Sequence, residues 1–520
     1  MKRGPARWRA PLAGIVSGLL FALAFPPFEL IVLLPLALVP WLVALFAEES
    51  PGRALVSGAL FGLVYWCASI PWIVYVVTHY GGQSGPMGVV SMAILALILA
   101  EWPAAVAWGT VACAPAGSWR RMAVFPLLWV ASEHARSFVY KGFPWNLTGH
   151  ALFRHPLWLQ TASVWGVYGV GALVAIVSAL LTFGIATRRL RPLALAASLA
   201  LAAGAFGAAR LAGPAPQGPE LSVALLQPNV TEEMRATPQG AAESYAVVRE
   251  QAREAAARQA ALIAFPESAL PLYWDQSPVL RRDLDAIAGG GSSILFNTVE
   301  EDADGRYYNV AKLLTPDGVA GSAYRKVHLV PFGEYVPLPK VFFFVRQISN
   351  DIGAFSAAAE PVVVRSGPLA LGVGICYEII YPELSRRETA SGANLLATIS
   401  NDSWYGRAGA QEQHFAGAVM RAVENGRFLI RAAITGISGI ADARGRILAE
   451  SRANERTIVY GAVRLLDGRT VWTRWGYWIP RLADVAGAAV LIFALVRLVR
   501  RRRAGSGERT AESLLHDRTR

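Results

Sequence analysis

Three residues in separate segments could carry nucleophilic or acid–base chemistry. Cys376 follows the apolar run 368–375, and Glu267 follows a Phe-Pro pair. Lys326 ends a Tyr-Arg-Lys sequence. A thiol that loses its proton becomes a nucleophile, and carboxylate or ammonium groups nearby can take its proton or stabilise charge. Each residue alone is a weak signal, because a glutamate after a strand or a lysine beside an arginine usually belongs to a solvated surface.

Cys376 differs from the two other cysteines in its surroundings. Cys67 and Cys113 lie in long apolar runs, whereas Cys376 lies in the polar part of the chain. The short apolar run before Cys376 predicts a buried strand. At the end of such a strand a thiol can meet a substrate at the edge of a sheet. The alternative is a small buried side chain without a chemical role, because free cysteine packs well in cores.

The elements that must position these residues fall into two regions of different composition. Of the 520 residues, 54% are hydrophobic and 17% are charged, whereas soluble domains are usually about one quarter charged. The apolar residues concentrate in 10–213 and 484–499, which indicates a membrane protein. Residues 218–470 have the composition of a soluble domain, and about 250 residues can bury a full core.

Eight apolar segments are predicted to be transmembrane helices, each of which needs about 20 residues. A signal peptide is an alternative for the first segment, but further spans follow at once, so an uncleaved helix is predicted. The predicted spans are 10–28, 30–47, 54–78, 87–114, 122–138, 157–186, 193–212 and 481–499. They divide the chain into a seven-helix region at 1–213, a domain at 218–470, a last helix at 481–499 and a basic tail at 500–520.

The distribution of basic residues predicts the orientation of the spans. The net charge is +12, and much of the basic charge lies beside the spans and in the tail, which argues against a nucleic-acid partner. With the N-terminus in the cytoplasm, Arg53, the pair at 120–121, the group at 188–191 and the tail all fall on the cytoplasmic side, as the positive-inside rule requires. The loop 139–156 is an exception. Both termini are therefore predicted in the cytoplasm, with residues 218–470 outside it.

A domain on the outer side of the membrane gives Cys376 a further reason to be reactive. Extracytoplasmic compartments are oxidising, and structural disulfides are expected there. The domain holds one cysteine and cannot form a disulfide internally, so a lone thiol favours a chemical use. Ionisable residues also occur within the spans: Glu101, Glu133, His134 and Arg136. They could line a cavity, or Glu133 and Arg136 could pair at i, i+3 near a helix end.

Residues 218–470 are predicted to form an α/β sandwich, because strand and helix patterns alternate along them. Strands are expected at 221–227, 261–265, 293–299, 309–314, 369–375, 394–399 and 428–435. Helices are expected at 240–260 and 411–425. The segment 214–219, which is rich in proline and glycine, is predicted to be the linker.

The three reactive residues and their neighbours resemble the Glu–Lys–Cys triad of the nitrilase, or carbon-nitrogen hydrolase, superfamily. Glu267 stands in Phe-Pro-Glu, Lys326 in Tyr-Arg-Lys and Cys376 in Gly-Ile-Cys-Tyr-Glu. Together with the eight predicted spans, the segments 142–145, 326–337 and 399–406 are similar to the bacterial apolipoprotein N-acyltransferase family. The resemblance implies an αββα sandwich on the periplasmic side of a bacterial inner membrane.

The resemblance also implies an activity and its partners. An acyl chain would pass from a phospholipid such as phosphatidylethanolamine to the amino group of the N-terminal S-diacylglyceryl-cysteine of an apolipoprotein, the last step of lipoprotein maturation. Cys376 would form a thioester, Glu267 would act as base, and Lys326 would stabilise the oxyanion. No metal or other cofactor is implied, and the sequence contains no P-loop and no cluster of His and Cys ligands. We expect a monomer.

Further residues receive supporting roles. Glu334 resembles a second glutamate of the family, and Tyr377 and Glu378 beside the nucleophile are predicted to assist. For Glu378 a purely structural role as hydrogen-bond acceptor is the alternative. A lid that dips into the membrane is predicted at 341–345, with a buried strand as the alternative. The aromatic residues predicted to form the lid or contact substrate are Trp145, Trp274, Phe342, Phe343 and Phe344.

Two other functions compete with acyl transfer. A membrane-anchored, nitrilase-like amidase or hydrolase would use the same triad and let water resolve the thioester, but it would need one anchoring helix rather than eight. A scaffold or transporter would need none of Glu267, Lys326 and Cys376, so the presence of all three argues against it.

Overall fold

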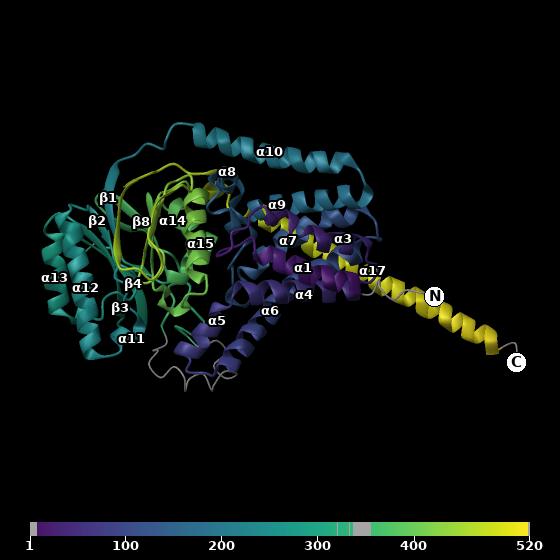
Figure 1. Ribbon diagram of the computed structural model, residues 1–520, viewed down its shortest axis with the longest axis horizontal. Helices are drawn as coiled ribbons and strands as arrows, with labels where there is room; N and C mark the ends of the chain where they lie inside the picture. The colour runs from purple at the N-terminus through teal and green to yellow at the C-terminus, as the bar shows by residue number, and fades with distance from the viewer. Residues whose placement is uncertain (1–7, 320, 332, 336–354, 518–520) are drawn as a thin grey trace.

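The computed structural model describes residues 8–319, 321–331, 333–335 and 355–517. A helical region and an α/β domain lie side by side, and the last helix extends away from the α/β domain (Figure 1). The helical region comprises α1 (Arg9–Ala22), α2 (Leu33–Leu36), α3 (Val39–Ala47), α4 (Pro51–Ser69), α5 (Trp72–Tyr75), the π-helix η2 (Val76–Tyr80), α6 (Gly85–Cys113), α7 (Trp119–Arg136), the 3-10 helices η3 (Val139–Lys141) and η4 (Thr148–Leu152), α8 (Pro156–Leu159), α9 (Ala162–Thr187), α10 (Leu190–Ala212), α16 (Val471–Trp475) and α17 (Trp478–Asp517).

Within the described residues, four helices are long and apolar enough to cross a membrane. They are α6, α9, α10 and the part Trp478–Arg497 of α17, and α4 with Trp72–Tyr80 makes a fifth candidate that is bent by 60°. The predicted count of eight spans is not confirmed. α1 and the segment Leu33–Ala47 are shorter than a span, and α7 has charged residues in both its first and last turns.

Ionisable side chains of α7 bind neighbouring segments. Glu133 accepts hydrogen bonds from the backbone N and Oγ of Thr148, at 2.6 and 2.8 Å. Arg136 donates to the carbonyls of Phe143 and Trp145, at 2.6 and 2.7 Å. Each side chain thus holds the loop that follows α7. These contacts differ from both alternatives considered for the two residues, lining a cavity or pairing with each other.

α9 is interrupted at Gly166, where the chain turns out of helical geometry. Gly166 has a φ of +66°, and a Cβ there would lie 2.5 Å from the ring of Trp472. A backbone with positive φ in so close a contact requires glycine. The interruption leaves the N–H of Val167 without a partner in the helix, and Glu424 of the α/β domain accepts it at 2.7 Å. The interruption of α9 therefore provides a backbone N–H that binds the α/β domain.

Two sheets form the centre of the α/β domain. The first has the strand order β13-β1-β2-β3-β4-β5, with β6 paired to β4, and the second has the order β12-β11-β10-β9-β8-β7. The first contains β1 (Glu220–Gln227), β2 (Leu262–Ala264), β3 (Ser293–Glu301), β4 (Tyr307–Thr315), β5 (Gly318–Val319), β6 (Tyr324–Arg325) and β13 (Thr457–Arg464). The second contains β7 (Val364–Ser366), β8 (Leu369–Ile375), β9 (Leu395–Ser400), β10 (Leu429–Ala433), β11 (Gly439–Ala441) and β12 (Ile447–Glu450).

Helices cover the outer face of each sheet and give four layers (Figure 1). α12 (Pro238–Ala257) and α13 (Pro278–Ala288) pack on the first sheet, and α14 (Pro382–Ala390) and α15 (Ala410–Asn425) lie on the side of the second. Short elements complete the domain: α11 (Glu232–Arg235), and the 3-10 helices η5 (Trp274–Gln276), η7 (Cys376–Ile380) and η8 (Asp402–Tyr405). This arrangement is the predicted αββα sandwich.

The cores of the two regions are continuous. One apolar cluster fills the space between the sheets. A second runs from the membrane helices into α15 and η7, and includes Phe21, Trp145, Tyr377 and Val419. α15 is therefore buried between the second sheet and the helical region, so the α/β domain is packed directly on the helical region rather than tethered to it.

Candidate active site

Cys376 lies at a sharp strand-to-helix turn. β8 pairs in parallel with β9 and is buried along its whole length, because a parallel strand covered on both faces needs a continuous apolar run. Cys376 is the first residue of η7 and has a φ of +55°. This conformation is uncommon for residues other than glycine and stores local strain that the surroundings must balance. The side chain is 4% exposed.

Lys326 and two carboxylates form a buried charge cluster. The Nζ of Lys326 lies 3.2 Å from Oε1 of Glu267 and 2.9 Å from Oε1 of Glu334. Asn309 donates its Nδ2 to both carboxylates, at 2.9 Å each. The second oxygen of Glu267 accepts from the backbone N of Asn401 at 3.1 Å. The cluster contains one ammonium and two carboxylates. The hydrogen-bond donors Asn309 and the backbone N of Asn401 stabilise the negative charge that the ammonium does not balance.

The two sheets bring this cluster and the thiol together. Glu267 and Lys326 follow strands β2 and β6 of the first sheet, and Cys376 follows β8 of the second. The charges of Glu267 and Lys326 both act on the thiol: burial and then Glu267 raise the pKa of Cys376, and Lys326 opposes them. The resting thiol is therefore protonated and requires a base. Burial lowers the pKa of Lys326, but Glu267 and Glu334 outweigh it and raise the pKa above its usual value, so Lys326 is an ammonium.

Glu378 ties the Lys326 segment to the strand that carries the cysteine. Its Oε1 accepts from the backbone N of Val327 and His328, at 2.7 and 2.9 Å, and its Oε2 accepts from the N of Ile375 at 2.9 Å. Both oxygens are thus engaged with backbone on the two sides of the site. This is the structural alternative foreseen for Glu378, and it fixes the spacing of Lys326 and Cys376.

Tyr377 faces the helical region. Its hydroxyl donates a hydrogen bond to the carbonyl of Gly142 at 3.4 Å. Its ring stacks against Trp145, with the ring centroids 6.5 Å apart. Trp145 is 1% exposed and donates its indole N–H to Gln413 at 2.6 Å. Gln413 in turn donates to the carbonyls of Pro26 and Ser69, at 3.0 and 2.9 Å. Trp145 is thus part of the contact between regions and is not on an exposed lid.

Trp274, another aromatic candidate, does not join the cluster. Trp274 packs against Phe296, with centroids 5.1 Å apart, in the core beneath α12 and α13. Its backbone N donates to Oγ1 of Thr298 at 3.0 Å. The predicted lid residues Phe342, Phe343 and Phe344 lie outside the described residues.

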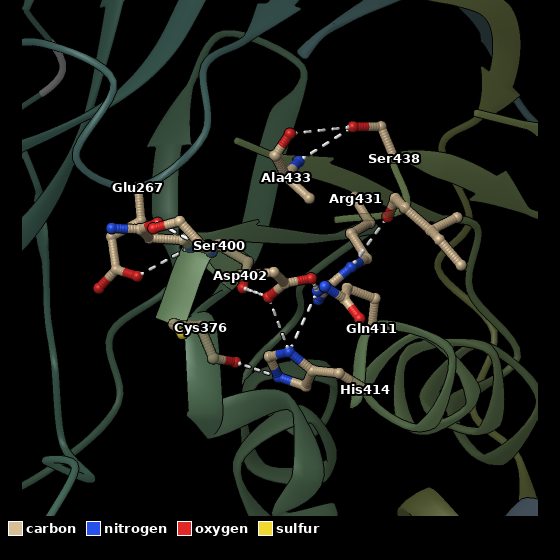
Figure 2. A network of polar contacts seen from close by, with 12 residues as sticks. Glu267, Cys376, Ser400, Asp402, Gln411, His414, Arg431, Ala433 and Ser438 are labelled. Atoms are coloured by element: carbon tan, nitrogen blue, oxygen red, sulfur yellow. Dashed lines mark hydrogen bonds and ion pairs between the residues drawn. The ribbon is translucent and has the colours of Figure 1, made fainter. Parts of the chain in front are cut away.

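A second buried polar network borders Cys376 and was assigned no role from the sequence (Figure 2). Asp402 lies 2.6 Å from Arg431, 3.1 Å from His414 and 2.6 Å from the Ser400 hydroxyl, which donates to it. His414 reaches the carbonyl of Cys376 at 2.9 Å. These four side chains are fully buried. The signal that could have revealed them is an arginine at the centre of the apolar strand β10 and a histidine within the apolar stretch of α15.

The site supplies the groups for covalent catalysis at a carbonyl carbon. It has a thiol, a carboxylate that can take a proton, and an ammonium that can stabilise an oxyanion. Among the residues that the structure describes, no group of three or more His, Cys, Asp or Glu side chains could hold a metal ion.

Comparison with known proteins places both regions in one family. Residues 222–471 match the carbon-nitrogen hydrolase family model, and residues 17–180 match the model of the apolipoprotein N-acyltransferase N-terminal domain. An apolipoprotein N-acyltransferase from Geobacter metallireducens is 36% identical over 500 residues, covering 92% of this chain and 94% of that protein. One from Methylococcus capsulatus is 33% identical, covering 96% and 97%.

The matches to solved structures cover about half of this chain. An amidase from Nesterenkonia sp. is 22% identical with a TM-score of 0.36, and the match covers 49% of this chain and 94% of that one. Nit3 from Saccharomyces cerevisiae is 21% identical with the same TM-score, covering 49% and 93%. The family is fixed instead by the full-length relatives, which span membrane helices and α/β domain alike. The chain therefore belongs to the apolipoprotein N-acyltransferase family.

Proposed function

We propose that the protein moves an acyl chain from a phospholipid of the phosphatidylethanolamine kind to the α-amino group of an N-terminal S-diacylglyceryl-cysteine on apolipoproteins. The observation that carries this proposal is the position of Cys376. η7 and the residue after it pack directly on the helical region through Tyr377 and Tyr381, whose hydroxyls both contact the carbonyl of Gly142. A nucleophile supported by membrane helices suits substrates whose acyl chains lie in a bilayer.

The first half-reaction acylates Cys376. Glu267 takes the thiol proton as the sulfur attacks the ester carbonyl of the phospholipid, and a carbon–sulfur bond forms. The carbonyl electrons move onto the oxygen, where Lys326 and the backbone N–H of Tyr377 stabilise them. The tetrahedral intermediate then collapses, the carbon–oxygen bond to glycerol breaks, and Glu267 returns the proton to the departing oxygen. The products are a thioester and a lysophospholipid.

The second half-reaction transfers the acyl chain to the lipoprotein. The neutral α-amine attacks the thioester carbon, and Glu267 takes a proton from the amine as the carbon–nitrogen bond forms. The same donors stabilise the second oxyanion. The carbon–sulfur bond breaks, and the thiol recovers its proton from Glu267. Splitting the transfer into two steps means that two lipid substrates need not be aligned at once.

Neighbouring carboxylates support these steps. Glu334 helps to keep Lys326 charged, since its carboxylate lies 2.9 Å from the ammonium. Glu378 keeps Lys326 and Cys376 in register through its three backbone hydrogen bonds. No cofactor enters the scheme.

The membrane arrangement belongs to the proposal as well. We assign residues 1–213 and 481–499 to the bilayer of a bacterial inner membrane, with eight crossings, both termini and the tail 500–520 in the cytoplasm, and residues 218–470 in the periplasm. The basic residues beside the helices support this orientation. The shorter helices α1 and α3 pack against α4 and α9, which supports their placement in the bundle. We expect the protein to act as a monomer.

The test uses purified protein in detergent and phosphatidylethanolamine with a labelled acyl chain, without acceptor. Wild type should take up label that neutral hydroxylamine removes, and Cys376→Ala should not. A diacylglyceryl lipopeptide should then discharge the label as an N-acyl product. Discharge by water at the same rate would favour a hydrolase, and an unlabelled but folded wild type would exclude the phospholipid as donor.

A further inference from the structure

The carbonyl of Cys376 is held by a histidine from a different element. His414 lies in α15, and its Nε2 is 2.9 Å from the Cys376 carbonyl oxygen. A carbonyl oxygen accepts hydrogen bonds and cannot donate them, so Nε2 carries the proton and His414 is the donor. Figure 2 shows the imidazole beneath the turn with this nitrogen directed at the carbonyl.

Holding this carbonyl also fixes the next N–H. The carbonyl of Cys376 and the N–H of Tyr377 belong to one planar trans peptide, so they point in opposite directions. Tyr377 lies in the first turn of η7, where backbone N–H groups have no partner within the helix. Because Cys376 has a φ of +55°, the peptide needs support from outside to keep its orientation. Rotation of this peptide would turn the Tyr377 N–H away from an acyl group bonded to the sulfur.

The histidine is itself fixed on its far side. Its Nδ1 lies 3.1 Å from both Nη2 of Arg431 and Oδ1 of Asp402, and the same nitrogen of Arg431 lies 2.6 Å from Oδ2 of Asp402. Burial and then the charge of Arg431 lower the pKa of His414 and outweigh Asp402, which raises it. The ring is therefore neutral, and because Nε2 carries its proton, Nδ1 accepts from Arg431. Arg431 thereby selects the tautomer that donates through Nε2, and Asp402 balances the charge of the arginine.

In a network this deeply buried, each polar group without a partner is costly. Among the described residues, Nη1 of Arg431 has no hydrogen-bond partner, whereas the other polar groups that contact the imidazole are paired. Ser400 donates to Asp402 at 2.6 Å, and Nε of Arg431 donates to the carbonyl of Ile437 at 3.1 Å. On the opposite side of the imidazole, Trp145 stacks with centroids 5.6 Å apart. The ring therefore has one orientation, set from the second sheet on one side and from the helical region on the other.

We propose that His414 is a positioning residue that aims the Tyr377 N–H at the carbonyl oxygen of the acyl group on Cys376. His414 exchanges no proton with the substrate. It acts by holding the peptide, so that the oxyanion formed when sulfur bonds to the carbonyl carbon meets both Lys326 and the Tyr377 N–H. This inference rests on the proposed thioester chemistry.

Two variants separate positioning from folding. His414→Gln keeps an N–H close to the place of Nε2, and His414→Leu removes the donor. Each is given labelled phosphatidylethanolamine, to measure acylation, and iodoacetamide, which alkylates the thiol without forming an oxyanion. A lost oxyanion donor lowers kcat by roughly 10²–10³. For a donor that is present but misaligned, we expect the leucine variant to acylate about 10- to 100-fold more slowly, with KM for the phospholipid and the pH profile of alkylation unchanged.

The glutamine variant should recover most of the acylation rate. The proposal is overturned if the leucine variant acylates as fast as wild type, if its alkylation falls in parallel with acylation, or if glutamine is as slow as leucine. His414→Met, which fills similar space without a donor, replaces the leucine variant if that protein does not fold. A wild type that takes up no label, yet is alkylated at Cys376, would instead contradict the proposed thioester function.

Discussion

Replacing Lys326 by methionine tests the charge balance of the site most directly. The change keeps the length of the side chain and removes the ammonium that lies 3.2 Å from Glu267 and 2.9 Å from Glu334. Lys326 is 1% exposed, so water cannot take its place. Both carboxylates would then share a buried site without the positive charge that now lies between them.

The contacts set the size of the effect. Removing one partner of a buried ion pair typically costs about 3–5 kcal/mol of stability. Glu267 and Glu334 keep other donors, since Asn309 binds both and backbone N–H groups bind one oxygen of each. We therefore expect a loss at the lower end, about 3 kcal/mol. Acylation should fall by roughly 10²–10³, the usual effect of losing one oxyanion donor.

Two measurements separate these effects. Denaturant unfolding of the protein in detergent gives the change in stability, and single-turnover labelling by phosphatidylethanolamine gives the acylation rate. Lys312→Met is a matched control. Lys312 also pairs with two carboxylates, Asp275 at 3.1 Å and Glu300 at 3.7 Å, but those partners are more exposed. Exposed pairs contribute about 0–1 kcal/mol, so the control should stay stable and active.

A double variant decides whether charge is the cause. Adding Glu267→Gln to Lys326→Met removes one of the two unbalanced carboxylates, so the double variant should be more stable than Lys326→Met alone while remaining inactive. The reasoning is refuted if Lys326→Met unfolds at the wild-type denaturant concentration. It is also refuted if the double variant is no more stable than the single one.

Other contacts give outcomes that separate assays can check. Glu267→Gln should abolish acylation and yet speed alkylation by iodoacetamide at fixed pH, because the carboxylate raises the pKa of the Cys376 thiol; slower alkylation would contradict this. In wild type, burial raises the same pKa, so alkylation should keep accelerating as pH rises past about 8.5, the value of a free thiol, and a plateau there would be inconsistent. Gly166→Ala should lower the unfolding free energy by about 1–3 kcal/mol, seen in thermal unfolding, because its φ is positive and a Cβ would meet Trp472. Gln413→Leu leaves an indole N–H and two carbonyls without partners, at about 1–3 kcal/mol for each group, so limited proteolysis should cut between the regions sooner.

The sequence predicted those parts of the site that depend on local pattern. Cys376 and Glu267 each end a short apolar run, and a buried strand reads as such a run wherever it lies in the chain. The expected strands from 221–227 to 428–435 correspond to β1, β2, β3, β4, β8, β9 and β10. β13 was not predicted from the sequence. Its buried and exposed side chains do not alternate clearly, and its partner strand β1 lies more than 200 residues away along the chain.

The remainder depends on tertiary packing that no local pattern encodes. His414 and Arg431 are polar residues within buried elements, and only the fold places them beneath the Cys376 peptide. Trp145 resembled a substrate-contacting aromatic, but the loop after α7 carries it into the contact with α15. The count of eight spans depended on apolar length alone. Among the described residues, four helices are long and apolar enough to cross a membrane, and α4 with Trp72–Tyr80 is a fifth candidate bent by 60°, so the count of eight stays a prediction.

These contacts assign the helical region a role beyond anchoring. Trp145 stacks on both Tyr377 and His414. Tyr377 carries the N–H of the Cys376–Tyr377 peptide, and His414 donates to the carbonyl of the same peptide. Gln413, one residue before His414, fixes α15 to Ser69 at the end of α4 and to Pro26 in the loop after α1. The orientation of the Cys376 peptide is therefore set by both regions at once, because the apolar cluster that holds it begins among the membrane helices and ends at η7. An α/β domain freed from those helices would keep its charged cluster and lose one face of the support for its nucleophile.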